Sequence, residues 1–213
     1  MLIKRWSMML IGNLLIGICV GLYRVSELGV DAFTCMNLGI SQFLHMSFGT
    51  WQLIMNTIIL IVIFFKARRC IGAGTIINMV GVGYMADFIY WLAHDVLQLS
   101  MTLPLQIAAI LLGSLFIGLG VALYMTADMG ISPYDSVPLM IQNASHGRLS
   151  FRLARMISDI TVVIIGILFC LLAGGNLWMI VGIGTICNAL LNGPLIQFFK
   201  TRVALPLLGK TED

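Results

Sequence analysis

The sequence predicts an all-α membrane protein with six transmembrane helices in two inverted three-span repeats, each repeat carrying a short re-entrant or interfacial helix. Three observations lead to this prediction. Hydrophobic residues make up 60% of the 213 residues and charged residues 10%, whereas soluble domains carry about 25% charged residues. Eleven of the 12 basic residues fall on one side of a six-span arrangement, and two stretches of the chain recur in the same order. This composition excludes a soluble domain, a disordered chain and an ordinary nucleic-acid binder.

The apolar segments are of two kinds. Lys4 and Arg5 precede the first one as in a signal peptide, but its length and the lack of a small-residue cleavage site favour a first span. Two segments, 31–44 and 133–145, are short and mixed in polarity. Six are long enough to cross a bilayer, which takes about 20 residues: 6–25, 48–65, 71–93, 104–127, 150–173 and 177–199.

The distribution of Lys and Arg decides whether the short segments cross. If neither crosses, both termini are cytoplasmic and 11 of the 12 basic residues lie inside, leaving Arg24 outside. If both cross, the split becomes 8 to 4. Cytoplasmic loops carry the excess of basic residues, so six spans are predicted. The expected location is the bacterial cytoplasmic (inner) membrane, multi-pass, with the N- and C-termini in the cytoplasm.

The two halves of the chain repeat one unit. Residues 12–30 (GNLLIGICVGLYRVSELGV) align with 113–131 (GSLFIGLGVALYMTADMGI) at 8 of 19 positions. Residues 71–78 (IGAGTIIN) align with 181–188 (VGIGTICN) at 5 of 8. Matched motifs in the same order indicate duplication. Because each unit contains three crossings, an odd number, the second copy must enter the membrane from the opposite side.

The predicted organisation is one membrane domain, residues 1–213. Repeat 1 covers about 6–93 and repeat 2 about 104–199, followed by a short cytoplasmic tail, 200–213. Many transporters are inverted repeats with their site at the repeat interface, although channels and some membrane enzymes share the device.

Three motifs carry a resemblance to a known family: LGVDAF (28–33), GTWQLIMN (49–56) and IGAGTIIN (71–78). With them the sequence resembles the YczE/YyaS-like family of bacterial integral membrane proteins, which is related to the YitT group. The resemblance extends over most of the chain, roughly residues 10–200. It implies a multi-span bacterial membrane protein and leaves the biochemical activity open.

The repeated G-x-G-T-x-x-N motif supplies the first candidate site residues. Thr75 and Asn78 match Thr185 and Asn188, and Asn192 follows one helical turn later. Small residues, Thr and Asn on one helix face are typical of close helix packing in membranes. The alternative is that the amides line a central pathway, and the two interpretations are compatible.

A charged pair in the second repeat supplies the next candidates. Arg155 and Asp159 are spaced i, i+4, so they share a helix face, and in the repeat alignment they match the neutral Gln52 and Asn56. A carboxylate inside the hydrocarbon costs about 2.5–3.5 kcal/mol and needs a partner. The pair is interpreted as a structural ion pair, as a gate or proton or ion relay, or as an anion contact through Arg155.

The starts of the two short segments are the third candidate. Asp31 and Ser132 are N-cap residue types, and Pro133 suits the first helical position. A half-helix N-terminus can seat an anionic group, but Asp31 and Asp135 would oppose an anion there. Capping and ligand binding are both retained as interpretations.

The leading hypothesis is a small secondary transporter or permease for an unidentified small polar solute, with a coupling ion or proton as a further partner. Its pathway would be lined by Asn56, the paired Thr and Asn residues above, Arg155 and Asp159. A passive channel, a non-transporting accessory or interaction protein and a binding subunit of a partner-driven importer are the alternatives. No enzyme activity, cofactor or metal site is expected, because no nucleophile–base pair or ligand cluster occurs; partners are the lipid bilayer and, in one possibility, further copies of the chain.

Overall fold

The computed structural model describes residues 2–66, 71–145 and 148–209, which contain helices and no strands. Two short π-helical turns extend the main helices, η2 (Leu92–Val96) after α4 and η3 (Lys200–Ala204) after α9. The α-helices are α1 (Leu2–Ser26), α2 (Ala32–Phe43), α3 (Phe48–Lys66), α4 (Ala73–Trp91), α5 (Leu103–Ala127), α6 (Pro133–Ala144), α7 (Phe151–Leu172), α8 (Leu177–Ile180), α9 (Ile183–Phe199) and α10 (Leu205–Leu207).

Six helices in the described part of the chain are long and apolar enough to cross a membrane. They coincide with the six predicted spans, and α2 and α6 coincide with the two short segments. Two differences appear. The span predicted over 177–199 is divided into α8 and α9, because the backbone at Val181 and Gly182 is extended. The predicted tail is helical as far as Leu207, and Ala204 and Leu208 are buried against Met8 and Met9 of α1.

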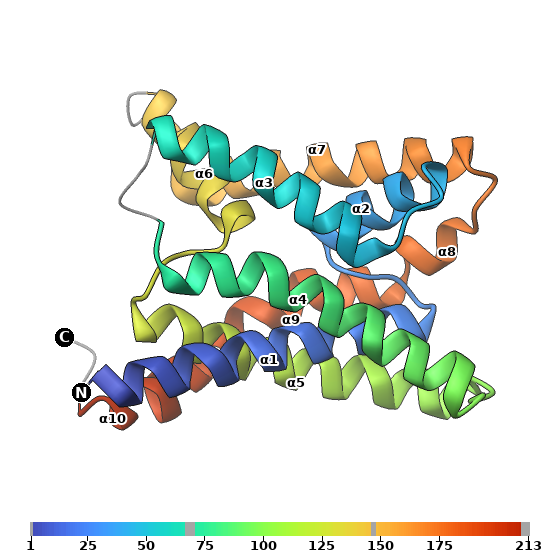
Figure 1. Ribbon diagram of the computed structural model, residues 1–213, viewed down its shortest axis with the longest axis horizontal. Helices are drawn as coiled ribbons and strands as arrows, with labels where there is room; N and C mark the ends of the chain where they lie inside the picture. The colour runs from blue at the N-terminus through green and yellow to red at the C-terminus, as the bar shows by residue number, and fades with distance from the viewer. Residues whose placement is uncertain (1, 67–70, 146–147, 210–213) are drawn as a thin grey trace.

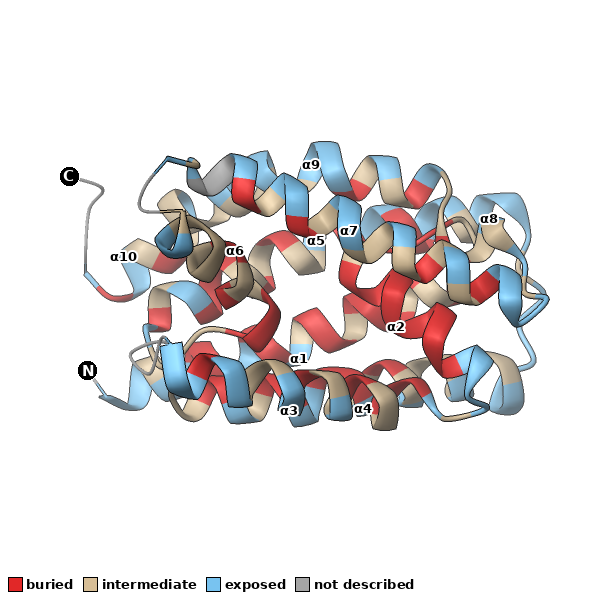
Figure 2. Cartoon of the chain, turned by 90° about the horizontal axis from the view of Figure 1, so that it is seen from above, coloured by how far each residue is buried: buried red, intermediate tan, exposed pale blue. Residues whose placement is uncertain are grey.

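The helices form two layers (Figure 1). One layer holds α1, α4, α5 and α9, in which α1 packs against α4 and α5, and α5 against α9. The other holds α2, α3, α6 and α7, in which α2 packs against α7, and α6 against α3 and α7. Buried residues concentrate on α1 and α2, whereas long faces of α7 and α9 are exposed (Figure 2), as suits helices that contact lipid.

Glycines let α1 and α5 approach closely at the centre. A Cβ atom on Gly12 would lie 2.7 Å from the Gly120 carbonyl oxygen, and one on Gly120 would lie 2.8 Å from the Gly12 carbonyl oxygen. Tyr124 of α5 also packs over Gly12, and Tyr23 of α1 packs over Gly113 of α5. In a membrane, where van der Waals packing drives helix association, such small-residue contacts hold helices together.

Matching residues of the two halves make reciprocal contacts. The Gly184 N–H donates to the Leu28 carbonyl (2.7 Å), and the Gly74 N–H donates to the Met129 carbonyl (2.8 Å). In the sequence alignment Leu28 matches Met129, and Gly74 matches Gly184. The loop after α1 therefore packs against the start of α9, and the loop after α5 packs against the start of α4.

The short helices α2 and α6 lie at opposite ends of their layer, with their first turns facing each other at its middle (Figure 1). Phe33 of α2 and Tyr134 of α6, which match in the repeat alignment, stack with ring centroids 4.4 Å apart and planes 14° from parallel. Both side chains are buried. The stack joins the two halves of the chain at the starts of α2 and α6.

Candidate functional site

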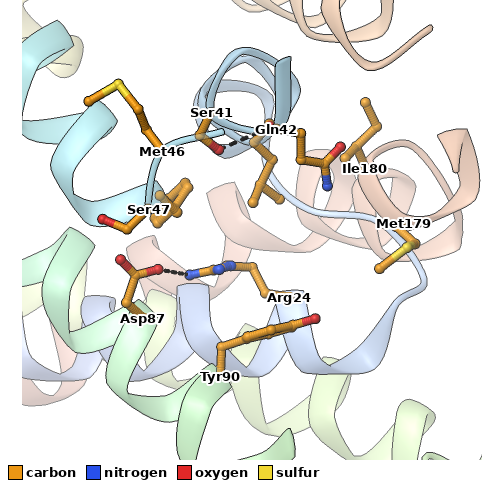
Figure 3. Close-up of a pocket in the computed structure, with 11 residues that line it drawn as sticks. Arg24, Ser41, Gln42, Met46, Ser47, Asp87, Tyr90, Met179 and Ile180 are labelled. Carbon is orange, nitrogen blue, oxygen red and sulfur yellow. Dashed lines mark hydrogen bonds and ion pairs between the residues drawn. The ribbon is translucent and has the colours of Figure 1, made fainter. Parts of the chain in front are cut away.

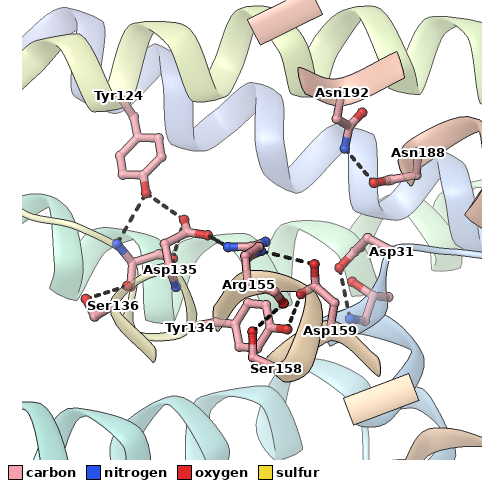
Figure 4. A network of polar contacts seen from close by, with 12 residues as sticks. Asp31, Tyr124, Tyr134, Asp135, Ser136, Arg155, Ser158, Asp159, Asn188 and Asn192 are labelled. Atoms are coloured by element: carbon pink, nitrogen blue, oxygen red, sulfur yellow. Dashed lines mark hydrogen bonds and ion pairs between the residues drawn. The ribbon is translucent and has the colours of Figure 1, made fainter. Parts of the chain in front are cut away.

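A charged network occupies the space between the two layers (Figure 4). Arg155 of α7 contacts two carboxylates: its Nη1 lies 2.8 Å from Asp135 Oδ1, and its Nε lies 3.2 Å from Asp159 Oδ2. Asp159 is one turn along the same helix, as the sequence spacing predicts, whereas Asp135 comes from α6. The network therefore ties the short helix α6 to α7, the span that follows it.

Hydroxyl groups complete the hydrogen bonding of both carboxylates. The Tyr124 and Ser132 hydroxyls donate to Asp135 Oδ2, each at 2.7 Å. The Tyr134 hydroxyl donates to Asp159 Oδ1, and the Arg155 guanidinium lies 5.0 Å from the centre of the Tyr134 ring. Each carboxylate is thus oriented by a tyrosine as well as by the arginine, which fixes the geometry of the charges.

The N-caps of the two short helices α2 and α6 border this network. Asp31 accepts a hydrogen bond from the Thr34 N–H of α2 (3.0 Å), and Ser132 accepts one from the Asp135 N–H of α6 (3.2 Å). Figure 4 places Asp31 on the side of Asp159 away from Asp135. The site has an excess of formal negative charge, because three carboxylates (Asp31, Asp135 and Asp159) face one guanidinium (Arg155). The positive ends of the two helix dipoles partly offset this excess.

The charged side chains are partly exposed although they lie between the layers. Exposed fractions are 37% for the Arg155 side chain, 31% for Asp135 and 34% for Asp159. Asp159 is the ninth of the 22 residues of α7, a position near the middle of a membrane-spanning helix. Intramembrane charges normally face the protein interior or a water-filled cavity, and this arrangement fits the second case.

The predicted asparagine pairs are not joined to each other. Asn78 donates to Asn13 Oδ1 of α1 (2.7 Å), whereas Asn192 donates to Asn188 Oδ1 (2.5 Å) within α9. Asn188 Nδ2 and Asn192 Oδ1 are buried and have no hydrogen-bond partner. Figure 4 shows this second pair across from Asp31 and Arg155.

The repeated threonines act at helix starts. The Thr75 and Thr185 hydroxyls accept from the Gly72 and Gly182 N–H groups at 3.1 and 3.2 Å. They also donate to backbone carbonyls, at Ile131 in the first case (2.8 Å). These bonds satisfy helix-terminal groups. Their predicted place in a pathway stays a prediction. Another residue that the sequence analysis places along a pathway, Asn56, is buried in α3.

A second ion pair lies near the end of α1. Arg24 Nη1 is 2.6 Å from Asp87 Oδ1 of α4, and Asp87 Oδ2 accepts from the Gly49 N–H of α3 (2.7 Å). The guanidinium lies between the Phe48 and Tyr90 rings, 4.5 and 4.7 Å from their centres. The sequence alone does not indicate this pair, although Arg24 is the basic residue that the predicted topology leaves outside.

The ion pair borders a pocket of about 260 Å³, named here the Arg24 pocket (Figure 3). Its polar lining includes Arg24, Ser41, Gln42, Ser47 and Asp87. Its apolar lining includes Leu38, Met46, Phe48, Met179 and Ile180. Within the described residues no group of three or more His, Cys, Asp or Glu side chains is arranged to hold a metal ion.

Comparison with known proteins places the chain in a family. A family model described as a family of unknown function, DUF6198, matches residues 3–201. The chain belongs to this family. No solved structure matches it.

Curated relatives agree with the membrane assignment. An uncharacterized membrane protein of Bacillus subtilis, YczE, is 25% identical and aligns over 92% of this chain and 86% of its own length. YyaS of the same organism is 24% identical over 94% of both chains. An uncharacterized protein of Haemophilus influenzae is 27% identical over 94% of this chain and 85% of its own. The resemblance to YczE/YyaS-like proteins is confirmed, and the chain is a multi-pass membrane protein.

Proposed function

We propose that the protein is a small secondary transporter or permease of the bacterial inner membrane. It moves a small polar solute past the Asp135–Arg155–Asp159 network at the interface of two inverted repeats. The observation that carries the proposal is a network of charges near the middle of a spanning helix whose side chains are about one-third exposed. Placing charges at that depth costs several kcal/mol, a cost that a water-filled pathway reduces.

The reciprocal contacts support the inverted repeats. Besides the paired loop contacts, Gly17 of α1 packs on Met85 of α4, and the matching Gly118 of α5 packs on Leu195 of α9. The stack of Phe33 on Tyr134 brings together two residues that correspond in the repeats. A pseudo-two-fold axis near this stack accounts for all these pairs. It makes α2 and α6 re-entrant half-helices that begin near the midplane.

One departure from symmetry supports alternating access. Helices α3 and α4 pack closely through Gly49 and Gly83. A Cβ atom on Gly83 would lie 3.0 Å from the Gly49 Cα, and one on Gly49 would lie 2.9 Å from the Gly83 carbonyl carbon. Their counterparts α7 and α9 make no comparable contact among the described residues, and Gly193, the match of Gly83, has open space at its Cβ position. Carriers of this class switch by rocking one repeat against the other. With α1 starting in the cytoplasm, the closed contact is outside, and the pathway opens to the cytoplasm.

Thiol labelling tests the pathway. In a variant without the five native cysteines, Asn188→Cys is treated with a membrane-impermeant thiol reagent from either side of vesicles. Leu190→Cys is the matched control, because Leu190 lies on the same helix and is exposed where lipid is expected. We expect Asn188→Cys to react from the cytoplasmic side and Leu190→Cys to stay unlabelled. Absence of labelling at position 188 from both sides would refute an aqueous pathway.

A passive channel is the second candidate, because two half-helices that meet at their N-termini also suit a conduction path. Planar-bilayer recordings separate the two functions. A transporter gives no unitary conductance steps, whereas a channel does.

Asp159→Asn tests the predicted coupling through Asp159. The variant should reach normal expression and lose uptake driven by a pH gradient. Lost expression would mean that the ion pair is structural.

A further inference from the structure

The Arg24 pocket has the features of a ligand site. Arg24 is about nine-tenths buried at its side chain and Asp87 about three-quarters, with exposed fractions of 10% and 23%. The pocket lies against both groups, and Figure 3 shows them side by side with Ser41, Gln42 and Ser47 around them.

The guanidinium is held ready for a carboxylate. Phe48 and Tyr90 cover its faces, so its edge is left for hydrogen bonding. Asp87 contacts one nitrogen, Nη1, and Nε has no hydrogen-bond partner. Arg presents donors in a rigid fork that binds carboxylates through two parallel hydrogen bonds. The single contact with Asp87 therefore leaves the buried Nε donor of Arg24 unused.

The charge of the pocket selects against simple ions. A free anion would meet the Asp87 carboxylate, and a free cation would meet Arg24. A molecule that carries both charges replaces the ion pair without leaving either group uncompensated, which would otherwise cost a few kcal/mol in a buried setting. The Ser41 and Ser47 hydroxyls border the same space and suit the remaining polar groups of such a molecule.

The size of the pocket limits the ligand. Its volume of about 260 Å³ lies just below the range of about 300–1,000 Å³ for sites of drug-sized ligands. Met46, Met179 and Leu38 form an apolar wall that suits a short aliphatic side chain, because methionine adapts to different shapes.

We propose that the Arg24 pocket binds a small zwitterion of the α-amino acid class, with its carboxylate on Arg24 and its ammonium group on Asp87. As a capture site for the transported solute, it rests on the proposed function and on the orientation that places the end of α1 outside. Ligand binding would replace the Arg24–Asp87 pair and so weaken the tie of α4 to α1. Because Asp87 also accepts from the Gly49 N–H, the same event loosens the contact between α3 and α4.

Thermal unfolding of the purified protein in detergent tests the binding step. The probes are L-alanine and glycine betaine as zwitterions, with acetate and methylammonium as the single charges. A zwitterion at about 100 times its Kd should raise the unfolding midpoint by about 5 °C or more. Acetate and methylammonium at the same concentration should not. No shift with either zwitterion, or equal shifts with all four probes, would overturn the proposal.

Two tryptophan substitutions locate the site without touching the ion pair. Gln42→Trp narrows the pocket, and Asn143→Trp is the control at the matching position of α6, where the side chain is exposed. Gln42→Trp should abolish the rise in the unfolding midpoint that a zwitterion causes, and Asn143→Trp should retain it. Equal shifts in both variants would place the ligand elsewhere.

Counterflow of labelled L-alanine in proteoliposomes separates this proposal from the transporter proposal. Binding without counterflow, together with an unlabelled Asn188→Cys variant, would leave the pocket standing and refute transport. A labelled Asn188→Cys variant without zwitterion binding would refute the pocket and leave the transporter standing.

Discussion

Gly130→Ala is expected to be strongly destabilising, because the loop after α5 has no room for a side chain. Gly130 has a φ of +114°, a conformation that L-residues rarely adopt. Its Cβ would lie 2.6 Å from both the Gly72 backbone nitrogen and the Thr75 Oγ1. The first of these is backbone and cannot rotate away, so the loop would have to leave the start of α4.

Three terms give the size of the stability loss expected for Gly130→Ala. Backbone strain at such a φ costs about 1–3 kcal/mol, and forcing extra atoms into a packed site costs about 1–3 kcal/mol. Displacing the loop also loses the hydrogen bond from the Gly74 N–H to the Met129 carbonyl, worth about 1 kcal/mol. The expected loss is about 3–7 kcal/mol, or at least about 6 °C in Tm for a chain of this size.

Two glycines separate the terms. Gly81 lies within α4 with open space at its Cβ position, so Gly81→Ala should leave Tm unchanged or slightly raised because Ala favours helix. Gly174 has a φ of +69° and open space, so Gly174→Ala should cost about 1 kcal/mol from the backbone alone. Tryptophan fluorescence during heating in detergent measures all three. A Gly130→Ala protein as stable as Gly81→Ala would refute the reasoning, and Gly29→Ala, the reciprocal variant, should match Gly130→Ala.

The remaining predictions concern the buried polar groups. Asn78→Leu leaves the Asn13 Oδ1 without its donor and should cost about 1–3 kcal/mol, most of which the double variant with Asn13→Leu should recover; additive losses in this cycle would show that the bond is unimportant. Arg155→Gln leaves two carboxylates without their cation and should lower Tm, and adding Asp159→Asn should restore part of the loss; no restoration would contradict the network. Tyr134→Phe should lower Tm by only a few degrees, because the ring remains and one hydroxyl is lost; a larger loss would mean that the hydroxyl holds the half-helix in place.

The sequence predicts features that depend on neighbours along the chain. Each span is an apolar run near the length of a bilayer crossing, so the six long helices follow from composition. The caps at Asp31 and Ser132 follow from residue types at helix starts. The contact of Arg155 with Asp159 follows from their spacing of one helical turn.

Features that depend on packing between helices were not predictable. Asp135 and Tyr134 join the charged network from α6, and no local pattern tells which face of a short helix meets α7. Arg24 and Asp87 are 63 residues apart, and each looks like an interfacial charge when taken alone. The interruption before Gly182 is hidden as well, because hydropathy runs through it while the backbone bends to meet the loop after α1.

The contact between the loop after α1 and the start of α9 has a consequence for biosynthesis. The Leu28 carbonyl accepts its hydrogen bond from the Gly184 N–H, a residue made 156 positions later, which at translation rates of about 5–20 residues per second means a delay of roughly 8–30 s. During that interval the Leu28 carbonyl lacks this hydrogen-bond donor, and lipid would offer no substitute for it. A chain that ended after the first repeat would lack the Gly184 N–H donor altogether. In two such half-length chains inserted in opposite directions, the matching Gly74 N–H of each chain would be the donor for the Leu28 carbonyl of the other. A truncated gene product is therefore expected to fold as an antiparallel pair.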